Sequence, residues 1–248
     1  MRRLVRAELL KLRTTQVWIW LLLASTAVAA AITTAGMFSK PLNLRDIAKI
    51  IATTNGACTF TFVLGILGIT TEFRHLTITP TVLATPRRAR VVTAKLIAYT
   101  LVGVGYASAC LAVSTAIALP WAAAKHISIH LDDPDLRRVL LGLPSTIILM
   151  GLVGIGVGAL IRNQVTAVVL GLIFILAVQN IIAAIPKVKN VWPYTPSGAI
   201  TEMLYTGPDS TLNHIRPLPV WGGVTVLLLW AFIPAILGAS ITMNRDVT

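Results

Sequence analysis

Two histidines and a group of aspartates are the first residues whose spacing could support chemistry. His126 and His130 stand four residues apart, so on a helix they would share one face and could ligate zinc. Asp132–Asp135 adds three carboxylates, but Pro134 interrupts the run. Nothing nearby supplies the hydrogen bonds that orient metal ligands. A polar loop is the simpler interpretation, and we predict no metal site.

Four glycines in a second stretch match a dinucleotide-binding fingerprint in spacing alone. That motif needs a strand, a turn and a helix, with the phosphate in water, whereas these glycines lie within a long apolar run. Small residues allow helices in a membrane to approach closely. We therefore predict helix packing for these glycines and for three similar small residues. They are Gly151, Gly154, Gly156 and Gly158, and then Gly103, Gly105 and Ala109.

No catalytic constellation is present in the sequence. It lacks a Walker A motif, a G-x-S-x-G elbow and an H-E-x-x-H pair, which are the patterns that hold ATP, a serine nucleophile or zinc. We expect neither enzyme activity nor a cofactor in this chain. Cys58 and Cys110 both lie in apolar runs, so we predict small packing residues rather than a disulfide.

Six uncharged stretches of 22 or more residues position everything else in the chain. About 20 apolar residues suffice for a helix to cross a bilayer. We therefore predict an all-α integral membrane protein, a single domain over residues 1–248 with six transmembrane helices. The stretches are Thr14–Ser39, Ile50–Thr71, Leu96–Ala124, Val139–Ile161, Asn163–Pro186 and Pro217–Asn244.

Charge distribution indicates how these spans are oriented. The chain is 56% hydrophobic and 12% charged with a net charge of +12, which in a membrane protein indicates anionic headgroups rather than nucleic acid. Basic residues are densest before the first span and in connections on the same side, so we predict both termini in the cytoplasm. Met1–Arg13 with Ala27–Ala29 resembles a cleaved signal peptide, but the apolar run to Phe38 favours a retained span.

The segments outside the spans carry further patterns. Residues 1–13 place leucine and valine at helical spacing among basic side chains, which predicts a short amphipathic helix in the membrane interface. Charge that only sets the topology is an equally open alternative. The outer loop 187–219 is rich in proline and aromatic residues, and a short helix is expected around Ser197–Tyr205. The charged residues assigned to the interfacial helix are Arg6, Glu8, Lys11 and Arg13.

Three polar side chains lie inside the predicted spans. Asn55, Gln179 and Asn180 either line a substrate route or form hydrogen bonds between helices. No span interior contains Asp, Glu, Lys or Arg. Ion-coupled carriers usually need such a group at depth, so the energy for transport is expected to come from outside the membrane.

A resemblance to a known family is carried by the segment after the second span. Thr71–Arg88, TEFRHLTITPTVLATPRR, closely resembles the first cytoplasmic loop of the permeases of type 2, or type V, ABC exporters. Ala7–Thr15 followed by Trp18 looks like their amphipathic entry helix, and Tyr194–Gly198 is similar to the segment before their last span. Glycine is common in the family where Leu76 stands here, so we assign Leu76 no role.

The resemblance implies one permease half of an exporter in the bacterial plasma membrane. A second permease chain, identical or a sister, and two separate ATPase subunits that bind ATP and Mg would complete it. The loop 72–95 would hold a coupling helix seated in an ATPase cleft. The cargo would be a small amphipathic or hydrophobic molecule such as a drug, antibiotic, peptide or lipid. The expected ATPase contacts are Glu72, Phe73, Arg74, His75 and Thr77.

Three alternatives remain open from the sequence. Glu72 could pair within this chain, with Arg74 or Arg13, instead of with an ATPase. The protein could be an ion-coupled secondary transporter or channel, which would need a titratable group inside a span. It could also be a membrane scaffold or self-immunity protein that binds a partner without transporting anything.

Overall fold

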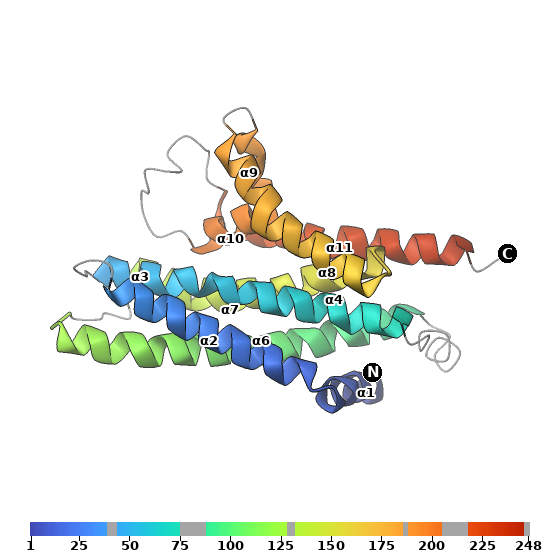
Figure 1. Cartoon of the computed structure of the whole chain (residues 1–248), viewed down its shortest axis with the longest axis horizontal. Helices are drawn as coiled ribbons and strands as arrows, with labels where there is room; N and C mark the ends of the chain where they lie inside the picture. Colours follow the sequence, from blue (N-terminus) through green and yellow to red (C-terminus); the bar gives the residue numbers. More distant parts are fainter. Residues whose placement is uncertain (39–43, 75–87, 128–131, 186–187, 205–217, 246–248) are drawn as a thin grey trace.

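The computed structural model describes residues 1–38, 44–74, 88–127, 132–185, 188–204 and 218–245, and no strand occurs among them. The predicted all-helical class is therefore confirmed for these residues (Figure 1). The α-helices are α1 (Arg2–Thr14), α2 (Val17–Phe38), α3 (Leu44–Thr53), α4 (Cys58–Arg74), α6 (Arg88–Ala124), α7 (Pro134–Leu160), α8 (Gln164–Ile173), α9 (Gln179–Ala184), α10 (Pro196–Leu204) and α11 (Val220–Arg245). The remaining turns are η1 (Thr54–Ala57), the π-helical η2 (Phe174–Val178) and η3 (Lys189–Tyr194).

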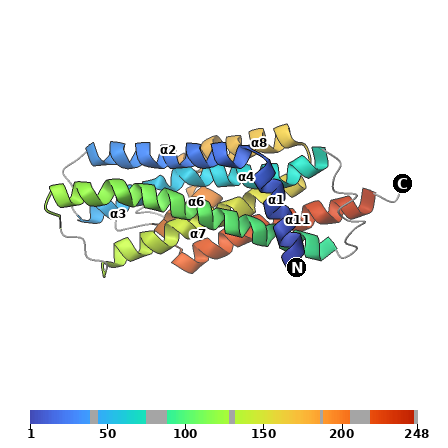
Figure 2. The same ribbon diagram turned by 90° about the horizontal axis from the view of Figure 1, so that it is seen from below.

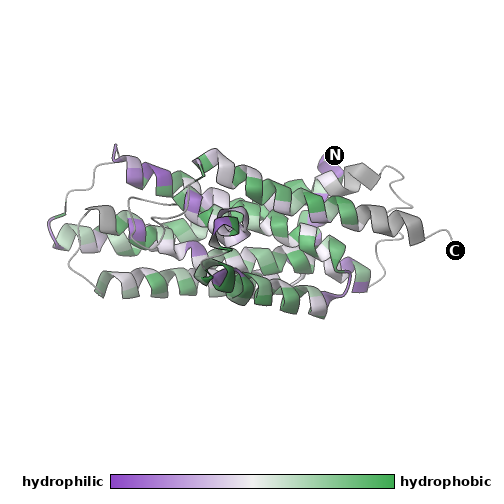
Figure 3. Ribbon diagram, turned by 90° about the horizontal axis from the view of Figure 1, so that it is seen from above, coloured by the Kyte–Doolittle hydropathy of each residue, from purple (hydrophilic) through white to green (hydrophobic). Residues whose placement is uncertain are grey.

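Six of these helical stretches are long and apolar enough to cross a membrane, as predicted. Each one overlaps one of the uncharged runs of the sequence, and large apolar side chains such as Trp20 and Leu141 point outward. Figure 3 shows apolar residues along most of the bundle, with hydrophilic residues at both ends and some between them. The chain is thus a multi-pass membrane protein. The spans are Val17–Phe38, Ile47–Arg74, Thr93–Ala124, Pro134–Leu160, Gln164–Ala184 and Val220–Gly238.

Helix α7 is the centre of the bundle. It packs against α4, α6, α10 and α11, and 72% of its most apolar window is buried, compared with 17% for α2. Leu143, Ile147, Met150 and Val153 repeat at helical spacing along α7 and are almost fully buried. Figures 1 and 2 show the long helices lying side by side around it.

Glycines bring the backbones of the central helices into direct contact. A Cβ added at Gly154 of α7 would lie 2.1 Å from the carbonyl oxygen of Phe62 in α4, and one at Gly156 would lie 2.3 Å from that of Ala231 in α11. The predicted packing role is confirmed for these glycines. It is wrong for Gly105, whose added Cβ would meet nothing within 4 Å, because this position of α6 faces outward.

The short helix expected around Ser197–Tyr205 is present as α10, and its buried face rests on α7 and α11. Arg138 of α7 caps the last turn of α10. Its guanidinium donates to the carbonyl oxygens of Glu202, at 2.5 Å, and Met203, at 3.2 Å. These are the carbonyl groups that a helix leaves without internal partners. Part of the outer loop 187–219 lies outside the described residues.

We expect Gly154→Ala to destabilise the protein, whereas Gly105→Ala serves as a matched control. The added methyl group at Gly154 would collide with the backbone of α4, and such overpacking costs about 1–3 kcal/mol. The measurement is the melting temperature of the detergent-solubilised protein, followed by size exclusion after heating. Equal melting temperatures for the two variants would contradict this account of α4–α7 packing.

Candidate functional site

Helix α1 lies across one end of the bundle, at an angle to the long helices (Figure 2). It packs against α6, and Leu12 contacts the edge of the hydrophobic core. Glu8 is 6% exposed although it is charged. Arg6 and Arg13 remain exposed on the same helix. The predicted N-terminal helix is therefore present, and one of its charged residues is directed into the protein.

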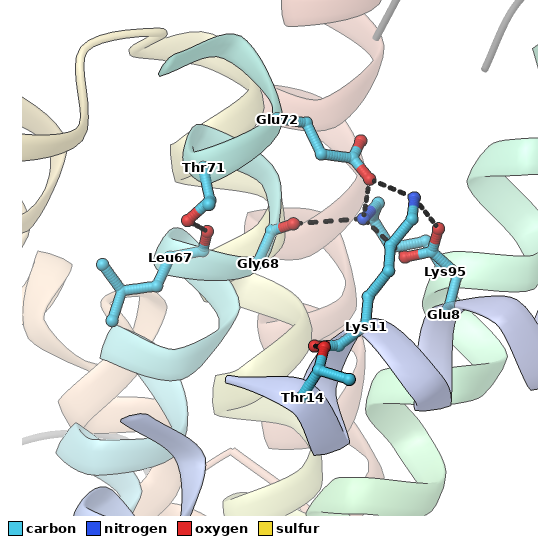
Figure 4. Close-up of polar contacts among 8 residues, drawn as sticks. All are labelled: Glu8, Lys11, Thr14, Leu67, Gly68, Thr71, Glu72 and Lys95. Carbon is cyan, nitrogen blue, oxygen red and sulfur yellow. Dashed lines mark hydrogen bonds and ion pairs between the residues drawn. The ribbon is translucent and has the colours of Figure 1, made fainter. Parts of the chain in front are cut away.

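Four charged side chains from three helices meet where α1 crosses the bundle (Figure 4). The Lys95 Nζ donates to Glu8 Oε2 at 2.8 Å and to Glu72 Oε1 at 3.1 Å. The Lys11 Nζ donates to Glu8 Oε1 at 2.8 Å and to Glu72 Oε1 at 3.0 Å. Each lysine thus bridges both carboxylates. We call Glu8, Lys11, Glu72 and Lys95 the four-charge cluster.

Lys95 is the most deeply placed cation of the cluster. Its side chain is 6% exposed, compared with 46% for that of Lys11. Its third hydrogen bond goes to the carbonyl oxygen of Gly68 at 3.1 Å, so all three ammonium protons have acceptors. Removing a charge from water costs several kcal/mol unless a partner compensates for it. Two carboxylates and two ammonium groups leave the cluster neutral.

Gly68 leaves the space into which Tyr99 packs beside the cluster. A Cβ at Gly68 would lie 1.6 Å from the Tyr99 hydroxyl oxygen, so only glycine allows the tyrosine to pack there. The Tyr99 ring also lies beneath the Lys95 ammonium, 5.8 Å from its centroid. A cation over an aromatic face is attracted by the ring quadrupole. Helices α4 and α6 therefore shape the pocket that accepts the lysine.

The acid–base properties of α1 follow from the cluster. Burial raises the pKa of the Glu8 carboxyl, but the Lys95 charge and the hydrogen bonds from both lysines outweigh it, so the pKa lies below its usual value. Burial lowers the pKa of Lys11, but its hydrogen bonds to Glu8 and Glu72 hold that pKa above its usual value. Both groups are consequently charged at neutral pH.

A cleft of about 530 Å³ opens beside the cluster, between α1, α4 and the start of α8. Besides the cluster itself, its walls include apolar side chains and Arg74, the exposed last residue of α4. Gln164, the first residue of α8, also lines it. The Gln164 Oε1 is buried and has no hydrogen-bond partner among the described residues. The lining of the cleft thus combines charged and polar side chains with apolar ones.

The residues expected to contact an ATPase are only partly described. Glu72 belongs to the four-charge cluster, so the ion pair within the chain exists, but with Lys11 and Lys95 rather than with Arg74 or Arg13. Phe73 is half-buried, and its ring lies 5.9 Å from the Arg162 guanidinium carbon. His75 and Thr77 lie outside the described residues.

The three polar residues expected along a substrate route occupy different surroundings. Asn55 lies in η1 and is half-buried. Gln179 is fully buried, and its Oε1 accepts a hydrogen bond from the backbone of Ser197 at 2.6 Å, which ties the fifth span to α10. Asn180 is exposed and donates to the carbonyl oxygen of Leu176 in η2, within the same span. Gln179 thus forms the interhelical bond that was the alternative to a pathway role.

One of the aspartates after the histidine pair has a local structural role. The Asp133 carboxylate caps α7, because it accepts hydrogen bonds from the backbone of Asp135 at 2.8 Å and Leu136 at 3.3 Å. Pro134 begins the helix, where its missing N–H costs nothing. His126 follows the end of α6 with a positive φ of 56°, and His130 lies outside the described residues.

Sequence reasoning missed Lys95 as a member of the site. It stands immediately before the predicted span Leu96–Ala124, where a lysine ordinarily extends to the membrane surface. Acidic residues are scarce in this chain, 9 in 248, and Glu8 lies in a basic helix. A single glutamate in an otherwise basic helix was the signal in the sequence that Glu8 could pair with a lysine of a distant helix.

No protein-family model matches this chain, and no match to a curated protein is found. The sequence pattern and the geometry of the four-charge cluster are therefore the features from which a function can be inferred.

We expect Lys95→Met to destabilise the protein more than Lys11→Met. Without Lys95, two buried carboxylates share one half-exposed ammonium, and breaking a buried pair costs about 3–5 kcal/mol. Melting temperatures in detergent measure the difference. The double variant Glu8→Gln, Lys95→Met should recover part of the loss. Equal losses for the two single variants would show that burial of Lys95 does not control stability.

Docking of α1 should depend on pH at both extremes. The lowered pKa of Glu8 means that its stabilisation is present above the usual value of 4.5 and is lost as the pH falls below it. The raised pKa of Lys11 means that its stabilisation is present below 10.5 and is lost as the pH rises above it. A nitroxide at exposed Leu10, introduced by Leu10→Cys, should gain mobility at both ends of the range. A flat mobility profile would contradict this.

Proposed function

We propose that this chain is the permease subunit of an ATP-driven exporter of the type 2, or type V, ABC class. Both termini would lie in the cytoplasm of a bacterium, and two separate ATPase subunits would supply ATP and Mg. The observation that carries the proposal is the place of the four-charge cluster. It joins α1 to the last turn of α4 and to the first turns of α6, the two helices that flank the segment resembling a coupling loop.

The cluster gives that segment a mechanical connection to the spans. Helix α4 ends at Arg74 and α6 begins at Arg88, so a push on the residues between them acts on both helices. Lys95 of α6 bonds Glu72 of α4, which makes the two ends move together. Glu8 adds α1 to the same unit through its bond to Lys95. An ATPase that engages the segment would thereby move three helices at once.

Packing then carries such a movement into the rest of the bundle. Helix α4 contacts α7 through backbone approaches, because an added Cβ at Gly65 would lie 2.1 Å from the carbonyl oxygen of Gly151. Interfaces this close do not deform gradually, so they transmit a rotation rather than absorb it. A change in angle between two such six-span subunits would alternately open the substrate route to each side.

The distribution of charge supports an external source of energy. Among the described span residues, every Asp, Glu, Lys and Arg lies within about one helical turn of a span end. A carrier driven by an ion gradient usually needs such a group at depth. The cargo is proposed to be small and amphipathic or hydrophobic. Asn55 and Asn180 remain candidates for its route, whereas the side-chain oxygen of Gln179 is held by the backbone of Ser197.

Purification of the tagged chain from its native membrane in mild detergent tests the proposal. We expect a stoichiometric partner with a Walker A motif, together with a second permease chain. Recovery of this chain alone, under conditions that preserve other transporter complexes, would contradict the exporter assignment.

The same complex allows a test of the cluster in coupling. Glu72→Ala should reduce the stimulation of ATP hydrolysis by the permease at least several-fold, because α4 would no longer move with α1 and α6. Glu202→Gln is the matched control, since this buried glutamate belongs to α10 and not to the cluster. Normal stimulation in Glu72→Ala, with normal yield of the complex, would remove Glu72 from the coupling site.

A further inference from the structure

We infer that the cleft between α1, α4 and the start of α8 binds the headgroup of an anionic phospholipid. The chemistry it recognises is a phosphate diester that carries a hydrogen-bond donor on one side and an acyl chain on the other, as in phosphatidylglycerol. The inference rests on the lining of the cleft and does not require that the protein be an exporter.

The cleft has one more positive charge than negative. Three cations line it, Lys11, Arg74 and Lys95, against the two carboxylates Glu8 and Glu72, which leaves a net charge of +1. The three bonds of Lys95 use all its protons. The positive charge that is available to a ligand is therefore held by the other two cations.

Lys11 and Arg74 suit a phosphate group. Lys11 uses two of its three ammonium protons on the carboxylates, and its side chain is 46% exposed, so one proton can reach a ligand. Arg74 ends α4 with an exposed side chain. Its guanidinium fork matches two phosphate oxygens, whereas the lysine acts as a point charge.

The side-chain oxygen of Gln164 favours a ligand that donates a hydrogen bond. Its Oε1 is buried at the cleft wall and accepts no hydrogen bond from the described residues. An unpaired buried acceptor is unfavourable, so a ligand that donates to it gains affinity once the glutamine side chain turns toward the cleft. The hydroxyl groups of a glycerol headgroup can donate in this way. The quaternary ammonium of a choline headgroup cannot.

The apolar wall favours a lipid over a free anion. Leu12, Leu64 and Leu67 line the cleft together with Val17, the first residue of the first span. The exposed apolar surface of α2 continues beyond it through Ile19 and Trp20. An inorganic phosphate would leave this wall unused, whereas an acyl chain would cover it. The volume of about 530 Å³ lies within the range of small-molecule sites, roughly 300–1,000 Å³.

The test is native mass spectrometry of the purified full-length chain in a neutral detergent, titrated with phosphatidylglycerol or phosphatidylcholine. We expect phosphatidylglycerol to bind at least about tenfold more tightly, equivalent to about 1.4 kcal/mol. Arg74→Gln should reduce this affinity about tenfold, by loss of a charge-assisted bond. Arg6→Gln is the matched control, because Arg6 is exposed on α1 and does not line the cleft.

Two further variants separate the contributions of the cleft. Leu67→Trp should block binding by filling the apolar side, and Gln164→Leu should lessen the preference for glycerol over choline. Equal losses in Arg6→Gln and Arg74→Gln would overturn the location, because they would indicate general attraction to basic residues. If millimolar inorganic phosphate displaced bound phosphatidylglycerol as effectively as added lipid does, the assignment to a lipid would be overturned.

Discussion

The burial of Lys95 is the constraint on which this end of the molecule depends. An ammonium group with 6% of its side chain exposed is tolerated only if opposite charges reach it. One carboxylate comes from the neighbouring helix α4 and the other from α1, so ion pairs hold the N-terminal helix to the bundle together with the packing of Leu12. Lys11 then balances the second negative charge. Two of these ion pairs connect α1 to α4 and α6 where it crosses the bundle.

Backbone contacts between helices make the remainder of the bundle stiff. Where glycines of α4 and α7 face each other, an added Cβ would lie as close as 2.1 Å to a carbonyl oxygen of the other helix. In a membrane, water does not drive apolar surfaces together, so close van der Waals packing holds the helices. Hydroxyl groups add specific bonds across the same interface, as when Thr61 donates to the carbonyl oxygen of Ile147 at 2.9 Å. Helix α4 is therefore held by ion pairs at one end and by close backbone packing along its length.

The sequence predicted the spans well because the signal is simple and local. A run of 22 or more residues without charge is typical of a helix that crosses a membrane. All six predicted runs form helices long and apolar enough to do so. The prediction of α10 also succeeded, since proline and aromatic residues marked its surroundings. The lone acid of α1 indicated a missing partner, but its identity could not be predicted, because two of the four bonds in the four-charge cluster join residues 61 and 87 positions apart. The packing role predicted for Gly105 was wrong for a related reason, because no sequence pattern shows which face of α6 meets another helix.

The neutrality of the cluster has a consequence for the surface of α1. Glu8 is the one acidic residue of that helix, and its charge is balanced inside the protein by Lys95 and Lys11. It therefore does not offset the exposed cations on the outer side, such as Arg6 and Arg13. A helix that lies at a membrane surface gains about 1 kcal/mol for each such cation near anionic lipid. In the proposed orientation, one buried acid thus fixes α1 to the bundle and leaves its basic face free for the membrane.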